Sequence, residues 1–140
     1  EIYTMSEHLL DIDIVTPARI IYSGKAESVS VPGTKGPFQV LFNHAPIISS
    51  LDIGAIKILD ENHHETIYAT DGGFVEVLKN HVSIIVETAE EAHSINVAIA
   101  EAKMQDLKVT LEATQNFTQR DELKKEIAKL ENKVRVAERK

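Results

Sequence analysis

The chain has 140 residues, a formal net charge of −7 and no cysteine, and 5% of its residues are aromatic. This length allows one compact domain with an appendage. The acidic balance and the scarcity of aromatic residues argue against a binder of nucleic acid or anionic membranes, and the lack of cysteine excludes disulfides and thiolate chemistry.

Charge is distributed unevenly along the chain. Residues 1–92 carry five Lys or Arg against fourteen Asp or Glu, whereas residues 93–140 carry ten against eight. No apolar run approaches the roughly 20 residues that span a bilayer. Residues 1–8 show neither the basic nor the apolar segment of a signal peptide, so none is expected. The two halves are expected to have different partners.

Residues 9–87 have the period of β-strands. Apolar side chains alternate with polar ones, as at Ile12 and Ile14, and breaks rich in Pro, Gly and Asn separate the runs. Turns are predicted at Ser23-Gly24 and, as a two-residue hairpin, at Lys79-Asn80. About ten short strands at this spacing predict an all-β sandwich or a flattened barrel. The absence of strand–helix–strand alternation argues against a parallel nucleotide-binding sheet.

One stretch of the predicted sheet has the features of a surface that binds a partner. It is a rigid turn that we call the tongue, centred on Thr34-Lys35 and bounded by glycines and prolines. It holds no nucleophile with a base beside it, so contact with a partner is the simplest role. The expected contact residues are Gly33, Thr34, Lys35, Gly36 and Pro37, and, after the next strand, Asn43 and His44.

After Thr88 the apolar residues recur every three or four positions, which predicts helices. Ser94 is a candidate N-cap, and Ile99 is expected to widen the apolar face of the first helix. Residues 114–118 interrupt the pattern. Thr118-x-x-Asp121 then resembles a capping box that opens a second helix. Its narrow apolar seam comprises Leu123, Ile127, Leu130, Val134 and Ala137.

These periods divide the chain into a sandwich over residues 1–88 and a two-helix hairpin over residues 89–140. In the second helix Lys125, Lys129 and Lys133 recur every four residues and form a basic stripe. Two interpretations stay open for this lysine stripe. It is either a solvated helix face or a docking surface for an acidic partner.

The remaining candidate residues are best explained by structural roles. His63 and His64 are adjacent in a predicted hairpin tip, so they point to opposite sides and do not share a metal ion. His81 stands alone in the sequence. Asp11 and Asp13 share one strand face, which we expect to be an outer, solubilising edge. No catalytic residue and no metal site is predicted.

An ordered set of short motifs gives a family resemblance. The motifs are Val15-Thr16-Pro17, Tyr22-Ser23-Gly24, Val31-Pro32-Gly33-Thr34-Lys35-Gly36, Asn43-His44-Ala45-Pro46, Asp71-Gly72-Gly73-Phe74-Val75-Glu76-Val77 and Val86-Glu87-Thr88-Ala89-Glu90. With these motifs in this order, the sequence closely resembles the epsilon subunit of F-type ATP synthases, called delta in mitochondria. The resemblance spans nearly the whole sandwich and places the hairpin where the family has it.

The resemblance implies a non-catalytic subunit of the central rotor. The sandwich would bind the gamma subunit and rest on the c-ring, with the tongue and Asn43-His44 toward the polar loops of the ring. The hairpin would fold against the sandwich or extend toward the catalytic alpha and beta subunits and restrain ATP hydrolysis. The basic residues that suit this role are Lys125, Lys129, Lys133 and Arg135. The implied location is the cytoplasmic face of a bacterial inner membrane, reached only through the complex.

One motif departs from the family. Some bacterial members bind ATP through Ile/Leu-Asp-x-x-Arg-Ala at the start of the first helix. The matching residues here are Ile95, Asn96, Ile99 and Ala100. Since Ile99 replaces the Arg whose guanidinium could pair with phosphate, weak or no ATP binding is expected and no cofactor is predicted.

Two other classes of function explain the sequence less well than a rotor subunit does. A small β-sandwich enzyme would need His and carboxylate residues that converge on a pocket, whereas these residues are scattered here. A free-standing interaction module built on a coiled coil would need a long unbroken heptad tract, and the interruption at residues 114–118 argues against it.

Overall fold

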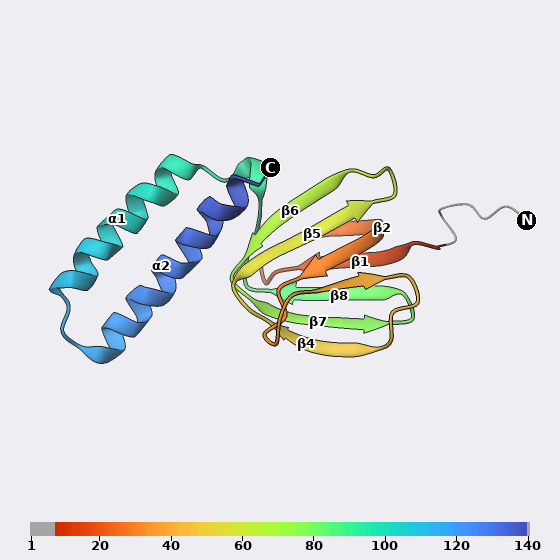
Figure 1. Ribbon diagram of the computed structural model, residues 1–140, viewed down its shortest axis with the longest axis horizontal. Coiled ribbons are helices and arrows are strands. Elements are labelled where there is room, and N and C mark those ends of the chain that lie inside the picture. Colours follow the sequence, from red (N-terminus) through yellow and green to blue (C-terminus); the bar gives the residue numbers. More distant parts are fainter. Residues whose placement is uncertain (1–7, 140) are drawn as a thin grey trace, which may run out of the picture.

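The computed structural model describes residues 8–139 and contains a mainly antiparallel β-structure followed by two helices (Figure 1). Nine strands lie within these residues, which agrees with the sandwich and hairpin predicted from the sequence. The strands are β1 (Leu10–Val15), β2 (Ile20–Val31), β3 (Phe38–Leu41), β4 (Ile47–Leu51), β5 (Gly54–Asp60), β6 (Glu65–Thr70), β7 (Gly73–Leu78), β8 (His81–Val86) and β9 (Ala89–Glu91). The helical elements are η2 (Ala92–Ser94), α1 (Val97–Ala113) and α2 (Phe117–Ala137).

The strands follow the order β4-β7-β8-β1-β2-β5-β6-β9, with β3 also paired to β2. All pairs are antiparallel except β1 with β8. The first half of β2 pairs with β1 and the second half lies between β3 and β5, so this one strand connects the two layers of the sandwich. A register shift between Ala26 and Ser28 marks the bend.

The turn predicted at Ser23-Gly24 is wrong. Both residues lie inside β2 and pair with Asp13 and Ile12 of β1. A Ser-Gly pair is tolerated in a strand when cross-strand hydrogen bonds hold it. Pairing with β1 therefore outweighs the turn propensity of these two residues. The hairpin turn at Lys79-Asn80 is confirmed: φ is +50° and +64°, as a two-residue hairpin turn requires.

The core fills the space between the two layers. Alternate residues of β1 and β8 point inward, and Ile12, Ile14, Val82 and Ile84 are almost completely buried. Burial of each such side chain stabilises the fold by roughly 1.5–3 kcal/mol relative to leaving it exposed.

The sheet also extends three residues beyond the expected boundary at residue 88, because β9 pairs with β6.

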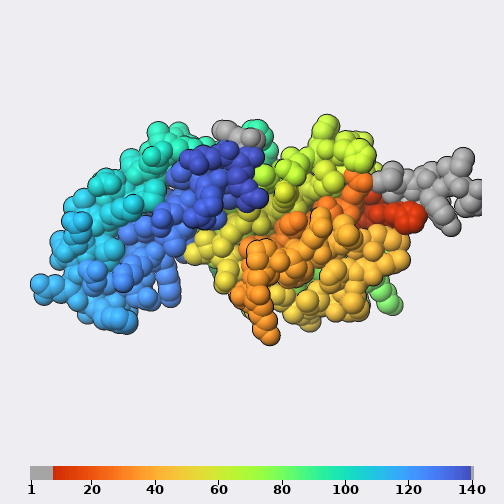
Figure 2. Space-filling model, viewed as in Figure 1, coloured from red at the N-terminus to blue at the C-terminus, as the bar shows by residue number. Residues whose placement is uncertain are grey.

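The hairpin lies at one end of the sandwich and projects away from it (Figures 1 and 2). α2 contacts β5, β6 and η2. Val136 and Ala137 pack in a small apolar cluster with Ile67, Ala69 and their neighbours, separate from the main core. The sandwich therefore has a core of its own, and the last turns of α2 make the principal contact between the two parts.

Candidate interaction surfaces

The tongue is held at its base and exposed at its tip. The Gly36 N–H donates to the Gly33 carbonyl oxygen at 2.9 Å, and the Thr34 N–H donates to the carbonyl oxygen of Ser50 in β4 at 3.0 Å. Gly36 has φ +128°, which an L side chain rarely adopts. Residues 34–37 are exposed, and the segment forms the orange projection below the sandwich in Figure 2. Gly33, one of the expected contact residues, is buried at the base, so residues 34–37 are the part of the tongue that a partner could contact.

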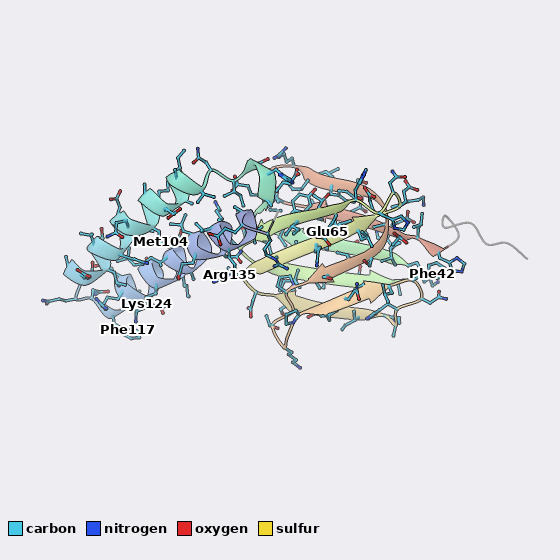
Figure 3. The ribbon with its side chains drawn as sticks, turned by 45° about the horizontal axis from the view of Figure 1, so that its top comes forward. Phe42, Glu65, Met104, Phe117, Lys124 and Arg135 are labelled. Carbon is cyan, nitrogen blue, oxygen red and sulfur yellow. The ribbon has the colours of Figure 1, made fainter. Side chains whose placement is uncertain are left out.

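The turn at Asn43-His44 lies at the opposite end of β3 from the tongue. The His44 ring leans back along this strand, and its centroid is 6.3 Å from that of Phe38. Phe38 in turn packs close to Gly33 at the base of the tongue. The structure thus connects the two predicted contact segments through one aromatic side chain, although they are not adjacent. Figure 3 shows Phe42, which precedes this turn, at the end of the sandwich away from the hairpin.

Asn43 also has a structural role that the sequence did not reveal. It adopts φ +66°, and its backbone N–H donates to Asn80 Oδ1 at 2.6 Å. The Asn80 Nδ2 donates to Asn43 Oδ1 at 3.3 Å. The turn after β3 is therefore fastened to the turn between β7 and β8.

An exposed apolar row crosses the outer face of the sandwich, and sequence reasoning missed it. Phe74 pairs with Ile85, and Ile85 with Val15, which pairs with Ile20. Phe74, Ile85 and Ile20 are 58%, 59% and 66% exposed. A row of this kind on a folded domain is typical of a surface that binds another protein. The signal was the continuous apolar run 84–86 in β8, where strict alternation would place a polar residue.

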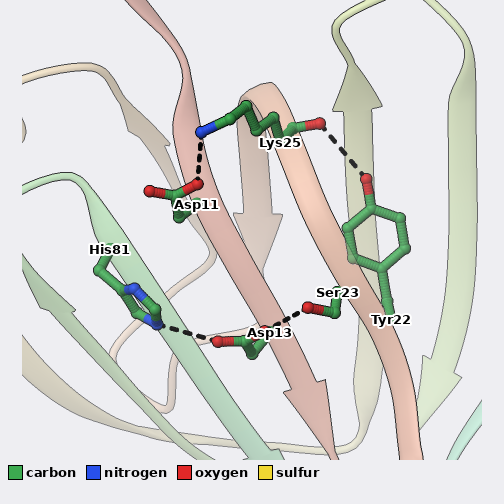
Figure 4. A network of polar contacts seen from close by, with 6 residues as sticks. All are labelled: Asp11, Asp13, Tyr22, Ser23, Lys25 and His81. Atoms are coloured by element: carbon green, nitrogen blue, oxygen red, sulfur yellow. Dashed lines mark hydrogen bonds and ion pairs between the residues drawn. The ribbon is translucent and has the colours of Figure 1, made fainter.

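A polar network lies beside the apolar row (Figure 4). Asp13 accepts a hydrogen bond from Ser23 Oγ at 2.8 Å and lies 3.0 Å from His81 Nε2. Lys25 Nζ lies 2.8 Å from Asp11 Oδ1, and this hydrogen bond and charge raise the pKa of Lys25. These contacts overturn one expectation and add a partner that the sequence did not reveal. β1 is a central strand with its carboxylates engaged, not an outer edge, and His81 has a partner 68 residues away in sequence.

The adjacent histidines at the β5–β6 turn face different carboxylates, as their opposite directions predict. His63 Nδ1 lies 2.6 Å from Glu27 Oε2, whereas His64 Nδ1 lies 4.0 Å from Asp60 Oδ2. Within residues 8–139, no group of three His, Cys, Asp or Glu side chains is arranged to hold a metal ion.

Both helices of the hairpin begin at an asparagine. Asn96 caps α1 by accepting from the Ile99 N–H at 3.1 Å, and Asn116 caps α2 by accepting from the Gln119 N–H at 2.9 Å. The predicted caps Ser94 and Thr118 are therefore wrong. The asparagines have extended backbones that aim the side chain at the third residue of the helix, whereas Thr118 is already helical.

The prediction that Ile99 widens the apolar face of α1 is wrong. Ala100 is buried, whereas Ile99 and Val109 are exposed. Ile95 is buried but lies before the helix, in the small cluster with β6. At the distal tip Phe117 is 84% exposed (Figure 3). α1 therefore has apolar side chains that α2 does not cover.

Each residue of the lysine stripe faces a carboxylate of this same chain. Lys125 lies 3.5 Å from Asp121, Lys129 3.0 Å from Glu126, and Lys133 3.4 Å from Glu90 of β9. Only the last pair joins the hairpin to the sandwich. The hydrogen bond with Glu126 is the main cause that raises the pKa of Lys129; the charges of Asp71 and Glu87 also raise it, and partial burial opposes them.

Comparison with known proteins decides the family. Residues 9–92 match the family described as the ATP synthase delta/epsilon chain, beta-sandwich domain. The chain belongs to this family.

Delta/epsilon relatives extend the match beyond the sandwich. The ATP synthase epsilon chain of Salinibacter ruber is 39% identical over 111 residues, which is 74% of each chain. The chloroplastic epsilon chain of Chlorella vulgaris is 40% identical over 113 residues, 81% of this chain and 84% of the relative. Since the family domain ends at residue 92, an alignment of this length continues into the hairpin.

The fold also matches chains in solved ATP synthase structures. A chain in the cryo-EM structure of the Euglena gracilis mitochondrial ATP synthase superposes with a TM-score of 0.80 at 15% identity, covering 89% of this chain and 78% of that chain. A chain of the Tetrahymena thermophila central stalk and c-ring structure gives 0.62 at 14% identity and covers 91% of this chain and 96% of the other.

The residues that depart from the ATP-binding motif of some epsilon subunits lie beside a cleft. A cleft of about 220 Å³ lies at the start of α1, lined by residues that include Glu90, Asn96, Ile99 and Lys133. The Asn96 side chain is engaged as a cap, and Ile99 supplies no donor for phosphate.

None of the described helices has both the length and the apolarity needed to cross a bilayer.

Proposed function

We propose that this chain is the epsilon-type, non-catalytic subunit of the central stalk in a proton-translocating F-type ATP synthase. The observation that carries this proposal is the match of the sandwich to the delta/epsilon family over residues 9–92. A rotor subunit must transmit torque without deforming. The continuous strand pairing from β4 to β9 around a closely packed core supplies that rigidity.

The apolar row on the outer face is our candidate for the contact with the gamma subunit. Phe74, Ile85 and Ile20 are spaced across neighbouring strands, so a partner could bury all three at once. A few side chains that become fully buried near the centre of a protein interface carry most of its binding energy.

Co-purification of gamma with this chain tests the contact. We expect Phe74→Asp and Ile85→Asp to abolish gamma capture, because each would bury a charge in the interface. Val109→Asp is the matched control, since Val109 is 57% exposed but lies on the hairpin. Capture that survives both sandwich variants would rule out this face.

The tongue and His44 are the candidate contact with the polar loops of the c-ring. Their connection through Phe38 gives a rigid surface along β3.

The proposed location of the complex is the cytoplasmic face of a bacterial inner membrane, and the chain would reach the membrane only through its partners.

The hairpin is the candidate brake on ATP hydrolysis. In an extended arrangement Lys125, Lys129, Lys133 and Arg135 would meet acidic segments of the alpha and beta subunits. The test compares hydrolysis by the parent complex with the full chain and with a chain that ends at Ala92, which keeps β9. A higher rate on truncation supports a brake, whereas an unchanged rate would leave the hairpin without a regulatory role.

A further inference from the structure

The contact between the hairpin and the sandwich is small and partly polar. Its apolar part consists mainly of Val136 and Ala137 against the ends of β6 and η2. Two small side chains bury far less apolar surface than the main core does. The polar groups at this junction therefore have a large share in deciding whether the hairpin stays on the sandwich.

Asn132 is the principal polar group of the junction. It is 3% exposed, and its Nδ2 donates to the Gly54 carbonyl oxygen at 2.9 Å and to the Thr70 carbonyl oxygen at 3.4 Å. One side-chain amide on α2 thus binds the start of β5 and the end of β6. If α2 moved away, this amide and both carbonyl groups would need new partners.

The end of the sandwich next to α2 is acidic. Glu90 lies 3.4 Å from Lys133, and Asp71 and Glu87 act electrostatically on Lys129. Asp71 also lines a cleft of about 460 Å³ together with Lys129 and Lys133. Lys129 and Lys133 of the stripe therefore lie near carboxylates of the sandwich while the hairpin is folded, whereas Lys125 pairs with its own helix.

We propose that this acidic end imitates an external acidic partner, and that Glu90–Lys133 and the Asn132 amide together form a latch that keeps the hairpin closed. If the proposed function holds, a catalytic subunit that binds the lysine stripe must first displace Glu90 from Lys133. The latch itself is a property of the isolated chain. It makes closure sensitive to ionic strength, because the Glu90–Lys133 pair is only partly buried.

The test is a distance measurement between two spin labels on the full chain. The chain has no cysteine, so Glu61→Cys and Gln115→Cys give unique, exposed labelling sites on the sandwich and at the hairpin tip. A closed hairpin gives a single narrow distance distribution, and an open hairpin gives a broad one. Circular dichroism of each variant checks that the helices remain folded.

Charge reversal gives the sharpest comparison. We expect Lys133→Glu or Glu90→Lys to lower the ratio of closed to open molecules by about two- to fivefold or more, and the double variant to restore it. Lys125→Glu is the matched control on the same stripe, because its partner Asp121 is on its own helix. Asn132→Asp, which replaces the donor by an acceptor of the same shape, is expected to lower the ratio about tenfold.

Equal opening by Lys133→Glu and Lys125→Glu, or failure of the double variant to restore closure, would overturn the latch. A rise in the open fraction of the wild-type chain at about 0.5 M salt supports it, and an unchanged distribution contradicts it. If the variants open the isolated chain but leave hydrolysis by the parent complex unchanged, the latch stands and the proposed brake fails.

Discussion

The side chain of Asn80 joins two turns that are 37 residues apart, accepting from the Asn43 N–H at 2.6 Å and donating to Asn43 Oδ1 at 3.3 Å. Both asparagines have positive φ, so each one combines a backbone role with a side-chain role. The contact orients the segment that carries His44 relative to β7 and β8.

Substitution of Asn80 should separate these two roles. Asn80→Gly removes the side-chain hydrogen bonds but tolerates φ +64°, so we expect a loss of about 1 kcal/mol in the free energy of unfolding. Asn80→Ala adds the strain of a left-handed backbone and should cost about 1 kcal/mol more. Urea unfolding of both variants measures the difference. Equal stability of the two would show that backbone strain is absent at this position.

The base of the tongue depends on a glycine at position 33. A Cβ added to Gly33 would lie 2.7 Å from the Gly36 carbonyl oxygen and 2.9 Å from Phe38 Cε1. We expect Gly33→Ala to lower the free energy of unfolding by about 1–3 kcal/mol. Gly24→Ala is the control, since its nearest contact is the flexible end of Tyr22 at 3.3 Å. A Gly33 variant as stable as the Gly24 variant would contradict this reading of the tongue.

Alkaline pH should destabilise the sandwich through Tyr68. Burial, and secondarily the charge of Glu91, raise the pKa of Tyr68 above its ordinary value of 10.0. Because the folded-state pKa is raised, this stabilising contribution is fully present below about pH 10 and is lost as pH rises through the folded pKa. Unfolding free energies measured from pH 8 to about pH 11 should fall, and fall less steeply in Tyr68→Phe. Parallel curves would exclude Tyr68 as the cause.

Titration with Mg-ATP should give little or no binding heat. The position where some epsilon subunits carry Arg is Ile99, and the Asn96 side chain is engaged in capping α1. Calorimetry on the isolated chain measures this, and micromolar affinity would contradict it. The double variant Asn96→Asp with Ile99→Arg keeps a good N-cap and supplies a guanidinium, so we expect it to bind Mg-ATP more tightly than the wild-type chain.

Local patterns failed at one predicted turn and at both predicted helix caps. Ser23-Gly24 has the composition of a turn, but pairing with β1 keeps both residues in a strand. Ser94 and Thr118 are good caps by residue type, and the neighbouring asparagines took the role because their backbones are extended there. Preferences of this kind amount to about 1 kcal/mol. Strand pairing overrides such a preference in the first case, and a competing asparagine cap matches it in the second.

The sequence by itself determined the fold class, the two-part organisation and the exposed tongue, because alternation, helical spacing and Pro-Gly breaks are local properties that follow from backbone geometry. It also identified the lysine stripe. Only the tertiary structure decided that Lys133 faces Glu90, that Asn132 fastens α2 to β5 and β6, and that Phe74, Ile85 and Ile20 form one row. These relationships join residues far apart in the chain. The pairing order of the strands and the docking of α2 against them, which no local pattern encodes, bring these residues together.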